Sequence, residues 1–218
     1  MKRTMCAVVV TALAAVSGCH KGPSPELMSR YQGRGLFTCC NLHYETDQIN
    51  DANYYVGTTL AFGTPVAIES VSSDSVTFTG DGKKLTLEHR YGRDQESMQQ
   101  YLDKVLVTAD PKPRVASFSH SAQAAIKEGR VERGMTREQV LLAVGYPATH
   151  KTPSTAASEW TYWYNRWVTY KVVFDDAGKV STVVGRPAPT YDQPIQEDAP
   201  PPPPPKASKP AAKSKGKK

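Results

Sequence analysis

Hydrophobic residues recur at helical spacing in the stretch 134–147, whose sequence is GMTREQVLLAVGYP. The apolar stripe of this helix consists of Val140, Leu141 and Val144. Thr136 precedes the stripe as a hydroxyl N-cap, and Gln139 follows three residues later, as in a capping box. Gly145 allows the left-handed conformation that ends a helix, and Pro147 prevents its continuation. The pattern predicts a short, well-capped helix.

After this helix, hydrophobic residues alternate with others in three runs, as they do in half-buried strands. The alternating residues are Trp160, Tyr162 and Tyr164, then Val168, Tyr170, Val172 and Phe174, and finally Val180, Thr182 and Val184. Turn residues separate the runs at 165–166 and 175–178. A second helix is expected over residues 121–129. The order predicts an α+β domain over residues 114–186, with two helices on one face of a three-stranded antiparallel sheet.

Residues 35–110 show short apolar runs with turn residues between them. The expected strands cover 36–44, 54–62, 66–71, 76–78 and 85–87. A helix is expected over 95–107, with Asp94 as its candidate N-cap. The sequence DPKP at 110–113 ends this helix and marks the boundary between the two units. Strands at this spacing are typical of a small, mostly-β unit such as an SH3-like sheet or open barrel.

Residues 1–18 have the features of a secretory signal, because two basic residues precede a short apolar run. The run is too short to span a bilayer. The sequence VSGC, which ends at Cys19, resembles the bacterial lipobox. This resemblance implies cleavage before Cys19 and lipidation of that residue, and the absence of aspartate at position 20 favours the outer membrane. An ordinary secretory signal, in which Cys19 is incidental, is the alternative.

Polar residues, proline and glycine dominate residues 19–34 and 187–218. The first segment is expected to be a tether between membrane and fold. The second contains an uninterrupted proline run at 200–205 and six lysines, which predicts a disordered tail. Such a basic arm suits peptidoglycan or an anionic lipid surface, and a solvated tail without a dedicated partner is the alternative.

The net charge of +6 belongs to the ends of the chain. Two of the 27 Lys and Arg residues lie in the signal and six lie in the tail, and three of the 21 Asp and Glu residues also lie in the tail, which leaves 19 basic against 18 acidic residues in between. The folded part is therefore expected to be nearly neutral. Nucleic acid is not an expected partner, because its binding requires a basic surface.

Two cysteines remain once Cys6 leaves with the signal and Cys19 is lipidated. They are the adjacent Cys39 and Cys40. Adjacent Cα atoms lie about 3.8 Å apart, which is shorter than the span of ordinary disulfides. We therefore expect buried thiols, with a vicinal or intermolecular disulfide as the alternative. A metal site with His43 is disfavoured, because a zinc ion needs about four ligands, and no metal or cofactor is expected.

The segment 89–94, HRYGRD, concentrates charge at the junction between a strand and a helix. Arg90 is expected to pair with a carboxylate, as such junctions commonly require. The functional alternative is a pocket for an anion or a peptide carboxylate.

The C-terminal pattern as a whole resembles the SmpA/OmlA (BamE-like) domain of outer-membrane lipoproteins. The residues that carry the resemblance are Gly134, Met135, Thr136, Glu138, Val140, Gly145, Pro147, Trp160, Tyr162, Phe174, Gly178 and Val180. The resemblance covers residues 117–186, and BLIP-like β-lactamase inhibitor modules share the implied fold. It implies a lipid-anchored, periplasm-facing outer-membrane protein with partners in the barrel-assembly complex.

The sequence offers no nucleophile–base pair, carboxylate dyad or phosphate loop, so we do not expect an enzyme. Large aromatics and arginine dominate protein interfaces. On this basis the expected partner-binding residues are Trp163, Arg166, Trp167 and Tyr170, and Tyr191 could extend an exposed patch. The favoured function is a non-enzymatic scaffold in outer-membrane protein assembly or envelope integrity. The alternatives are a peptidoglycan-binding tether built on residues 35–110, and an inhibitor or regulator of an envelope enzyme.

Overall fold

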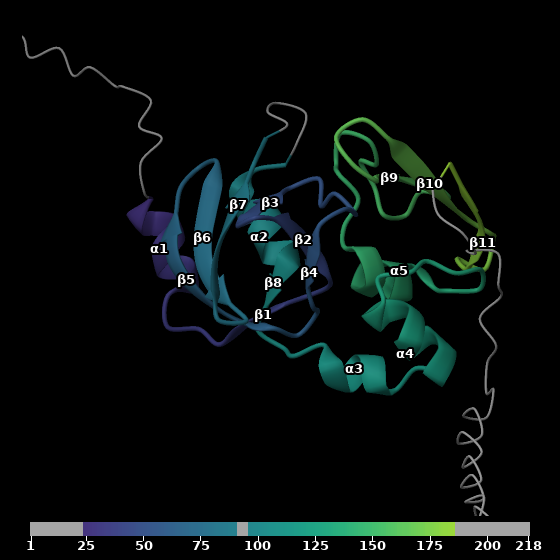
Figure 1. Cartoon of the computed structure of the whole chain (residues 1–218), viewed down its shortest axis with the longest axis horizontal. Helices are drawn as coiled ribbons and strands as arrows, with labels where there is room; N and C mark the ends of the chain where they lie inside the picture. The colour runs from purple at the N-terminus through teal and green to yellow at the C-terminus, as the bar shows by residue number, and fades with distance from the viewer. Residues whose placement is uncertain (1–23, 91–95, 186–218) are drawn as a thin grey trace, which may run out of the picture.

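The computed structural model describes residues 24–90 and 96–185 (Figure 1). The first half of the chain forms a curled eight-stranded sheet with two helices, and the second half forms a three-stranded sheet with three helices. The expected signal, the expected acylation site Cys19 and the expected tail lie outside the described residues. None of the helices in the described part is long and apolar enough to cross a bilayer.

A short helix, α1 (Pro25–Tyr31), opens the described part of the chain. The Ser24 side chain accepts from the Leu27 amide, and proline occupies the first helical turn, where its missing N–H costs nothing. The helix packs against β5, and the buried Tyr31 hydroxyl donates to Asp103 Oδ1 at 2.8 Å. This differs from the tether expected over residues 19–34, because its C-terminal part is folded onto the sheet.

The large sheet has the strand order β4-β2-β3-β7-β6-β5-β1-β8. Its strands are β1 (Leu36–Thr38), β2 (Leu42–Glu45), β3 (Gln48–Asn50), β4 (Thr58–Leu60), β5 (Pro65–Val71), β6 (Ser75–Gly80), β7 (Lys83–Glu88) and β8 (Leu106–Val107). All neighbouring strands are antiparallel except β3 and β7. Helix α2 (Met98–Val105) buries Met98, Tyr101, Leu102 and Val105 in the same core as the strands.

Three local expectations in this half differ from the structure. The strand expected over 36–44 is interrupted by a bend at Cys39 and Cys40, and the strand expected over 54–62 shrinks to β4. Helix α2 begins later than expected, because Ser97 forms a capping box with Gln100 and takes the N-cap role expected of Asp94. The sheet has eight strands, and its likeness to an SH3 barrel stays a prediction.

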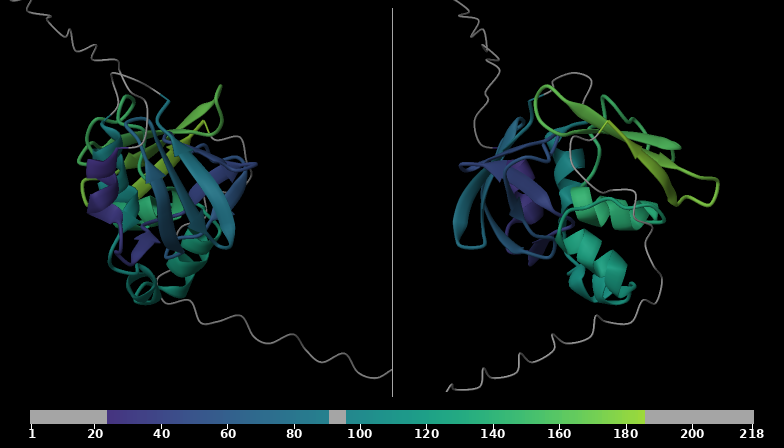
Figure 2. Two further views of the ribbon diagram at one scale, coloured as in Figure 1. Left: turned by 90° about the vertical axis from the view of Figure 1, so that its left-hand side faces the viewer. Right: turned by 45° about the vertical axis from the view of Figure 1, so that its right-hand side comes forward.

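The second half contains α3 (Lys112–Ala116), α4 (His120–Lys127), α5 (Arg137–Val144), β9 (Glu159–Trp163), β10 (Thr169–Phe174) and β11 (Val180–Val184). The three strands form an antiparallel sheet in the order β11-β10-β9, and the helices lie on one side of it (Figure 2). The expected α+β arrangement is therefore confirmed. The capping box of Thr136 and Gln139 is formed, and Gly145 ends α5 with a positive φ of 77°. Helix α3 occupies the expected boundary around 110–113.

The two halves are joined by a seam of buried hydrogen bonds. Asn41 Nδ2 donates to the carbonyl oxygens of Ile126 at 2.7 Å and Ala143 at 2.9 Å, and Asn53 Nδ2 donates to that of Val144 at 2.9 Å. These carbonyls belong to the last turns of α4 and α5, where the regular hydrogen-bonding pattern of a helix ends. The asparagines of the first half therefore cap the helices of the second half.

Backbone and aromatic contacts continue the seam along β9. The amides of Tyr55 and Val56 donate to the carbonyls of Trp163 and Tyr164, each at 3.2 Å. The Tyr55 ring stacks on Tyr164 with centroids 5.6 Å apart and lies 5.4 Å from the His43 ring. The segment around Tyr55 thus brings the two sheets together.

Candidate functional site

The loop between β9 and β10 presents an exposed tryptophan on a fixed backbone. Asn165 Oδ1 accepts from the amides of Trp167 at 2.8 Å and Val168 at 2.9 Å, and the Tyr164 amide donates to the Val168 carbonyl at 2.8 Å. An asparagine that bonds the backbone two and three residues ahead is typical of a tight turn. Trp167, which lies at the tip of this turn, is 82% exposed. The local sequence therefore holds a large apolar side chain in water instead of burying it.

Exposed apolar residues gather at this end of the small sheet. Within the described residues, the large exposed hydrophobic side chains are Trp167, Val168 and Val184. Val184 pairs with Lys171 near the start of β10, and Gly185 follows it close to the Thr169 carbonyl. The exposed Arg166 lies beside Trp167. We call Arg166, Trp167, Val168 and Val184 the hairpin patch. Such a combination of aromatic, aliphatic and arginine side chains is typical of interface hot spots.

Two of the four expected partner-binding residues are not free at the surface. Tyr170 is only 2% exposed, and its ring stacks on Tyr162 with centroids 5.5 Å apart. The expectation that Tyr170 binds a partner is therefore wrong. The alternation along β10 places it on the face that packs in the core with α5, together with Val172 and Phe174. Alternation alone does not reveal which face a strand buries.

Trp163 is half-buried on the opposite face of β9. Its ring lies 6.5 Å from Tyr54 and 6.1 Å from His150, and Lys151 Nζ lies 5.4 Å from its centroid. Trp163 therefore packs among these side chains, whereas Arg166 and Trp167 are exposed to solvent. Tyr191, the fourth aromatic candidate, lies outside the described residues.

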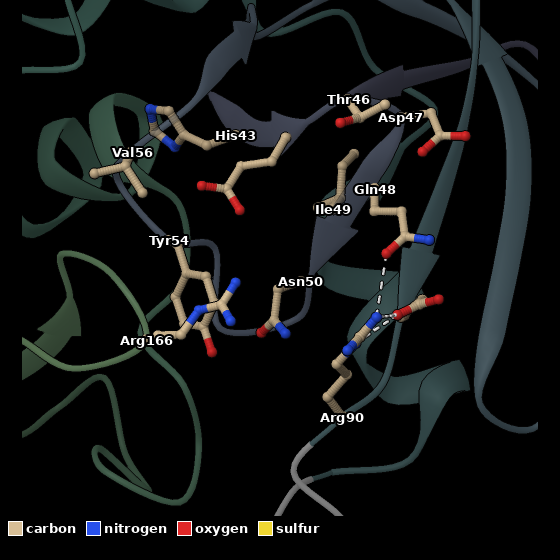
Figure 3. Close-up of a pocket in the computed structure, with 12 residues that line it drawn as sticks. His43, Thr46, Asp47, Gln48, Ile49, Asn50, Tyr54, Val56, Arg90 and Arg166 are labelled. Atoms are coloured by element: carbon tan, nitrogen blue, oxygen red, sulfur yellow. Dashed lines mark hydrogen bonds and ion pairs between the residues drawn. The ribbon is translucent and has the colours of Figure 1, made fainter.

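An open groove of about 670 Å³ lies between the two halves, and Arg166 forms part of its wall (Figure 3). The other lining residues are His43, Glu45, Thr46, Asp47, Gln48, Ile49, Asn50, Tyr54, Val56, Glu88 and Arg90. They come from the hairpin of β2 and β3, the end of β7 and the segment that joins β3 to β4. The hairpin patch and the groove therefore share Arg166.

The groove displays charges of both signs. Arg90 forms an ion pair with Glu88, and its Nη2 donates to Gln48 Oε1 at 3.1 Å (Figure 3). The expected pairing of Arg90 with a carboxylate is therefore confirmed. Glu45, Asp47 and Arg166 have no ion pair among the residues that the structure describes, and all three are exposed. These side chains are available to a ligand that carries both positive and negative groups.

Sequence reasoning missed most of this groove. Glu45 and Asp47 flank Thr46, which has a positive φ of 61° at the tip of the β2–β3 hairpin. A positive φ at a non-glycine residue marks a tight turn. From sequence, such a pair of acidic residues is typical of any solvated turn, and only the folded chain brings it opposite Arg166.

The adjacent cysteines form a disulfide, Cys39–Cys40. The expectation of free buried thiols is therefore wrong. It rested on the short distance between adjacent Cα atoms, but the structure forms the bond at a Cα–Cα distance of 3.8 Å, in the bend between β1 and β2. In the described part of the chain, no group of three or more His, Cys, Asp and Glu residues is arranged to hold a metal ion.

Several groups in the core have shifted pKa values. Burial, with a hydrogen bond to Asp103, raises the pKa of Tyr31 to about 12. Burial also raises the pKa values of Tyr101 and Tyr162. The Tyr162 hydroxyl donates to the Gly145 carbonyl at 3.0 Å, so its neutral form helps to close α5. The hydroxyl groups of Tyr31 and Tyr162 are therefore structural donors.

Comparison with known proteins supports the domain assignment of the second half. No curated protein and no solved structure gives a significant match to the chain. Residues 126–183 match the family model described as "Outer membrane protein assembly factor BamE domain". This match spans the end of α4, α5 and most of the three-stranded sheet. Residues 126–183 are therefore a BamE domain, the SmpA/OmlA-like module expected in this part of the chain.

Proposed function

We propose that this protein is a non-enzymatic scaffold that is anchored in the outer membrane through Cys19 and binds envelope proteins on its periplasmic side. The single observation that carries the proposal is the hairpin patch of the BamE domain, where Trp167 is held in solvent by a rigid turn. An exposed tryptophan beside an arginine is a strong candidate for an interface hot spot. The partners are proteins of outer-membrane assembly, as the domain description implies.

The packing of α1 supports a position close to the bilayer. The Ser24 amide donates to the Val71 carbonyl at 2.6 Å, so the chain is already attached to β5 at Ser24. The five residues that follow a lipidated Cys19 reach at most about 18 Å. The scaffold would therefore stay near the membrane surface, where it meets partners that are themselves embedded there.

Affinity capture of the full-length lipidated protein from solubilised outer membranes tests this proposal. The wild type should retain outer-membrane assembly proteins, and Trp167→Ala should lose most of them. Asp176→Ala is the control, because Asp176 is also exposed but lies in the turn at the other end of the sheet. Equal capture by the wild type and Trp167→Ala would contradict the proposed docking surface.

A peptidoglycan-binding tether is the second candidate, and the polar groove favours it. Glu45, Asp47 and Arg166 offer both charges to a peptide that carries amino and carboxylate groups. Cosedimentation of the full-length protein with purified sacculi tests this function. Loss of sedimentation in Glu45→Gln/Asp47→Asn would favour the tether. If only removal of residues 187–218 abolishes sedimentation, the basic tail and not the groove carries the wall contact. Specific binding to a purified envelope hydrolase would instead favour an inhibitor or regulator.

A further inference from the structure

The Cys39–Cys40 disulfide occupies the bend that connects β1 to β2. Cys40 is 1% exposed and belongs to the core of the first half, whereas Cys39 is half-buried at the edge of that core. A bond between neighbouring cysteines closes a small ring that includes their shared peptide unit. The ring therefore restricts the backbone at this bend.

Hydrogen bonds on both sides connect this ring to the two halves of the molecule. The Cys39 amide donates to the Val105 carbonyl at 2.9 Å, at the end of α2 in the first half. The Asn41 amide donates to the Leu142 carbonyl at 3.1 Å, in the last turn of α5 in the second half. The residues closed into this ring thus lie between the two hydrogen bonds that reach the ends of α2 and α5.

Asn41, which follows the ring directly, is the most connected residue of the seam. Its Nδ2 bonds Ile126 and Ala143, and its Oδ1 accepts from the Phe62 amide at 3.0 Å. These bonds require one orientation of the Asn41 backbone and side chain. Because the disulfide restricts Cys39 and Cys40, it also lowers the entropy cost of holding Asn41 in this orientation.

We propose that Cys39–Cys40 is a redox-modifiable site whose state controls how firmly the two halves are held together. A dithiol reductant would act on it by thiol–disulfide exchange. One of its thiolates attacks the more accessible sulfur, that of Cys39, and the Cys40 thiolate leaves and takes up a proton. The second thiol of the reductant then releases Cys39 as a thiol and becomes part of the oxidised reductant. Two electrons and two protons pass to the protein.

Reduction frees the bend without removing any side chain. The chain at Cys39 and Cys40 then samples more conformations, and the seam bonds of Asn41 open more often. The strands β6 and β7 are remote from the bend in the sheet order and keep their own pairing. The effect is therefore local to the seam, which includes the wall of the groove formed by the segment around Tyr54 and Val56.

Amide hydrogen exchange of the full-length protein tests this proposal, before and after treatment with a dithiol. Alkylation and mapping of the peptide that contains Cys39 and Cys40 establish their redox state in the same samples. We expect no alkylation before reduction. After reduction, exchange should rise about tenfold at the amides of Asn41, Tyr55 and Val56, while the β6–β7 amides stay protected.

The variant Cys39→Ser/Cys40→Ser is the control. It should show the raised seam exchange without dithiol and no further response to it. Alkylation of both cysteines before reduction would overturn the proposal, because the disulfide would then be absent. Unchanged seam exchange after complete reduction would also overturn it, as would an equal rise in β6 and β7. None of these results depends on lipidation or on the proposed partner.

Discussion

The side-chain amide of Asn53 donates to the Val144 carbonyl at 2.9 Å, across the seam between the two sheets. The same Nδ2 also donates to the Asn41 carbonyl at 3.1 Å, and Oδ1 accepts from the His43 amide at 2.8 Å. Asn53 is buried and has a positive φ of 46°, which asparagine tolerates better than most residues. The Asn53 side chain thus satisfies three backbone groups. Through its bond to Val144 it connects the BamE domain to the first half of the chain.

Replacing this residue should destabilise the whole fold. Asn53→Ala leaves buried backbone groups unpaired, and we expect a loss of about 1–3 kcal/mol in the free energy of unfolding. Urea denaturation measures it. Gln32→Ala, which removes an exposed amide, should change the free energy by less than about 0.5 kcal/mol. Similar small losses in both variants would show that the seam contributes little.

Two aromatic residues near the hairpin should behave in opposite ways. Tyr170→Ala creates a cavity beside Tyr162 in the core, and we expect a loss of about 3–5 kcal/mol in the free energy of unfolding. Trp167→Ala removes an exposed ring and should change stability by less than about 0.5 kcal/mol. Denaturation of both variants separates a binding role from a packing role. A large loss of stability in Trp167→Ala would argue against a docking surface.

Alkaline pH should weaken the contact between α1 and α2. The pKa of Tyr31 is raised to about 12 in the folded state, so the unfolded chain loses this proton first. The stabilisation is complete below about pH 10 and is lost as the pH rises toward 12. We expect Tyr31→Phe to be less stable than the wild type at pH 8, with a difference that shrinks above pH 10. A difference that stays constant from pH 8 to 11.5 would contradict this assignment.

The cap of α5 should contribute to the stability of the BamE domain. The Thr136 side chain accepts from the Gln139 amide at 3.3 Å, and Gln139 Oε1 accepts from the Thr136 amide at 2.8 Å. Thr136→Ala should therefore cost about 1 kcal/mol of unfolding free energy. Thr136→Ser keeps the hydroxyl and should recover most of it in thermal denaturation. Equal losses in the two variants would indicate that the methyl group matters more than the cap.

Local signals made much of the fold predictable. The capping box that begins α5 and the glycine that ends it both lie in its own sequence, so its pattern was sufficient to place the helix. The signal for α1 was also local, since serine precedes proline at its start, but the surrounding polar residues resemble a linker. Short polar helices depend on the surface they pack against, and that surface is distant in sequence.

The site was less predictable because its contacts join distant parts of the chain. Asn41 and Ala143 are 102 residues apart, and a single asparagine in a sequence is more typical of a turn. The prediction of an exposed side chain was correct for Trp167 and wrong for Tyr170. The alternation of hydrophobic residues gives the period of a strand and does not show which face is buried. The disulfide was only the alternative expectation, because the bend at Cys39 and Cys40 depends on bonds to the distant residues Val105 and Leu142.

The most direct test of the proposed scaffold is site-specific photocrosslinking in cells, with a photoreactive residue in place of Trp167 and, separately, in place of Asp176. The scaffold proposal predicts that the Trp167 position crosslinks to an outer-membrane assembly protein and that the Asp176 position does not. If the Trp167 position gives no protein adduct, or the same adducts as Asp176, the hairpin patch is not the docking surface and the scaffold proposal is contradicted.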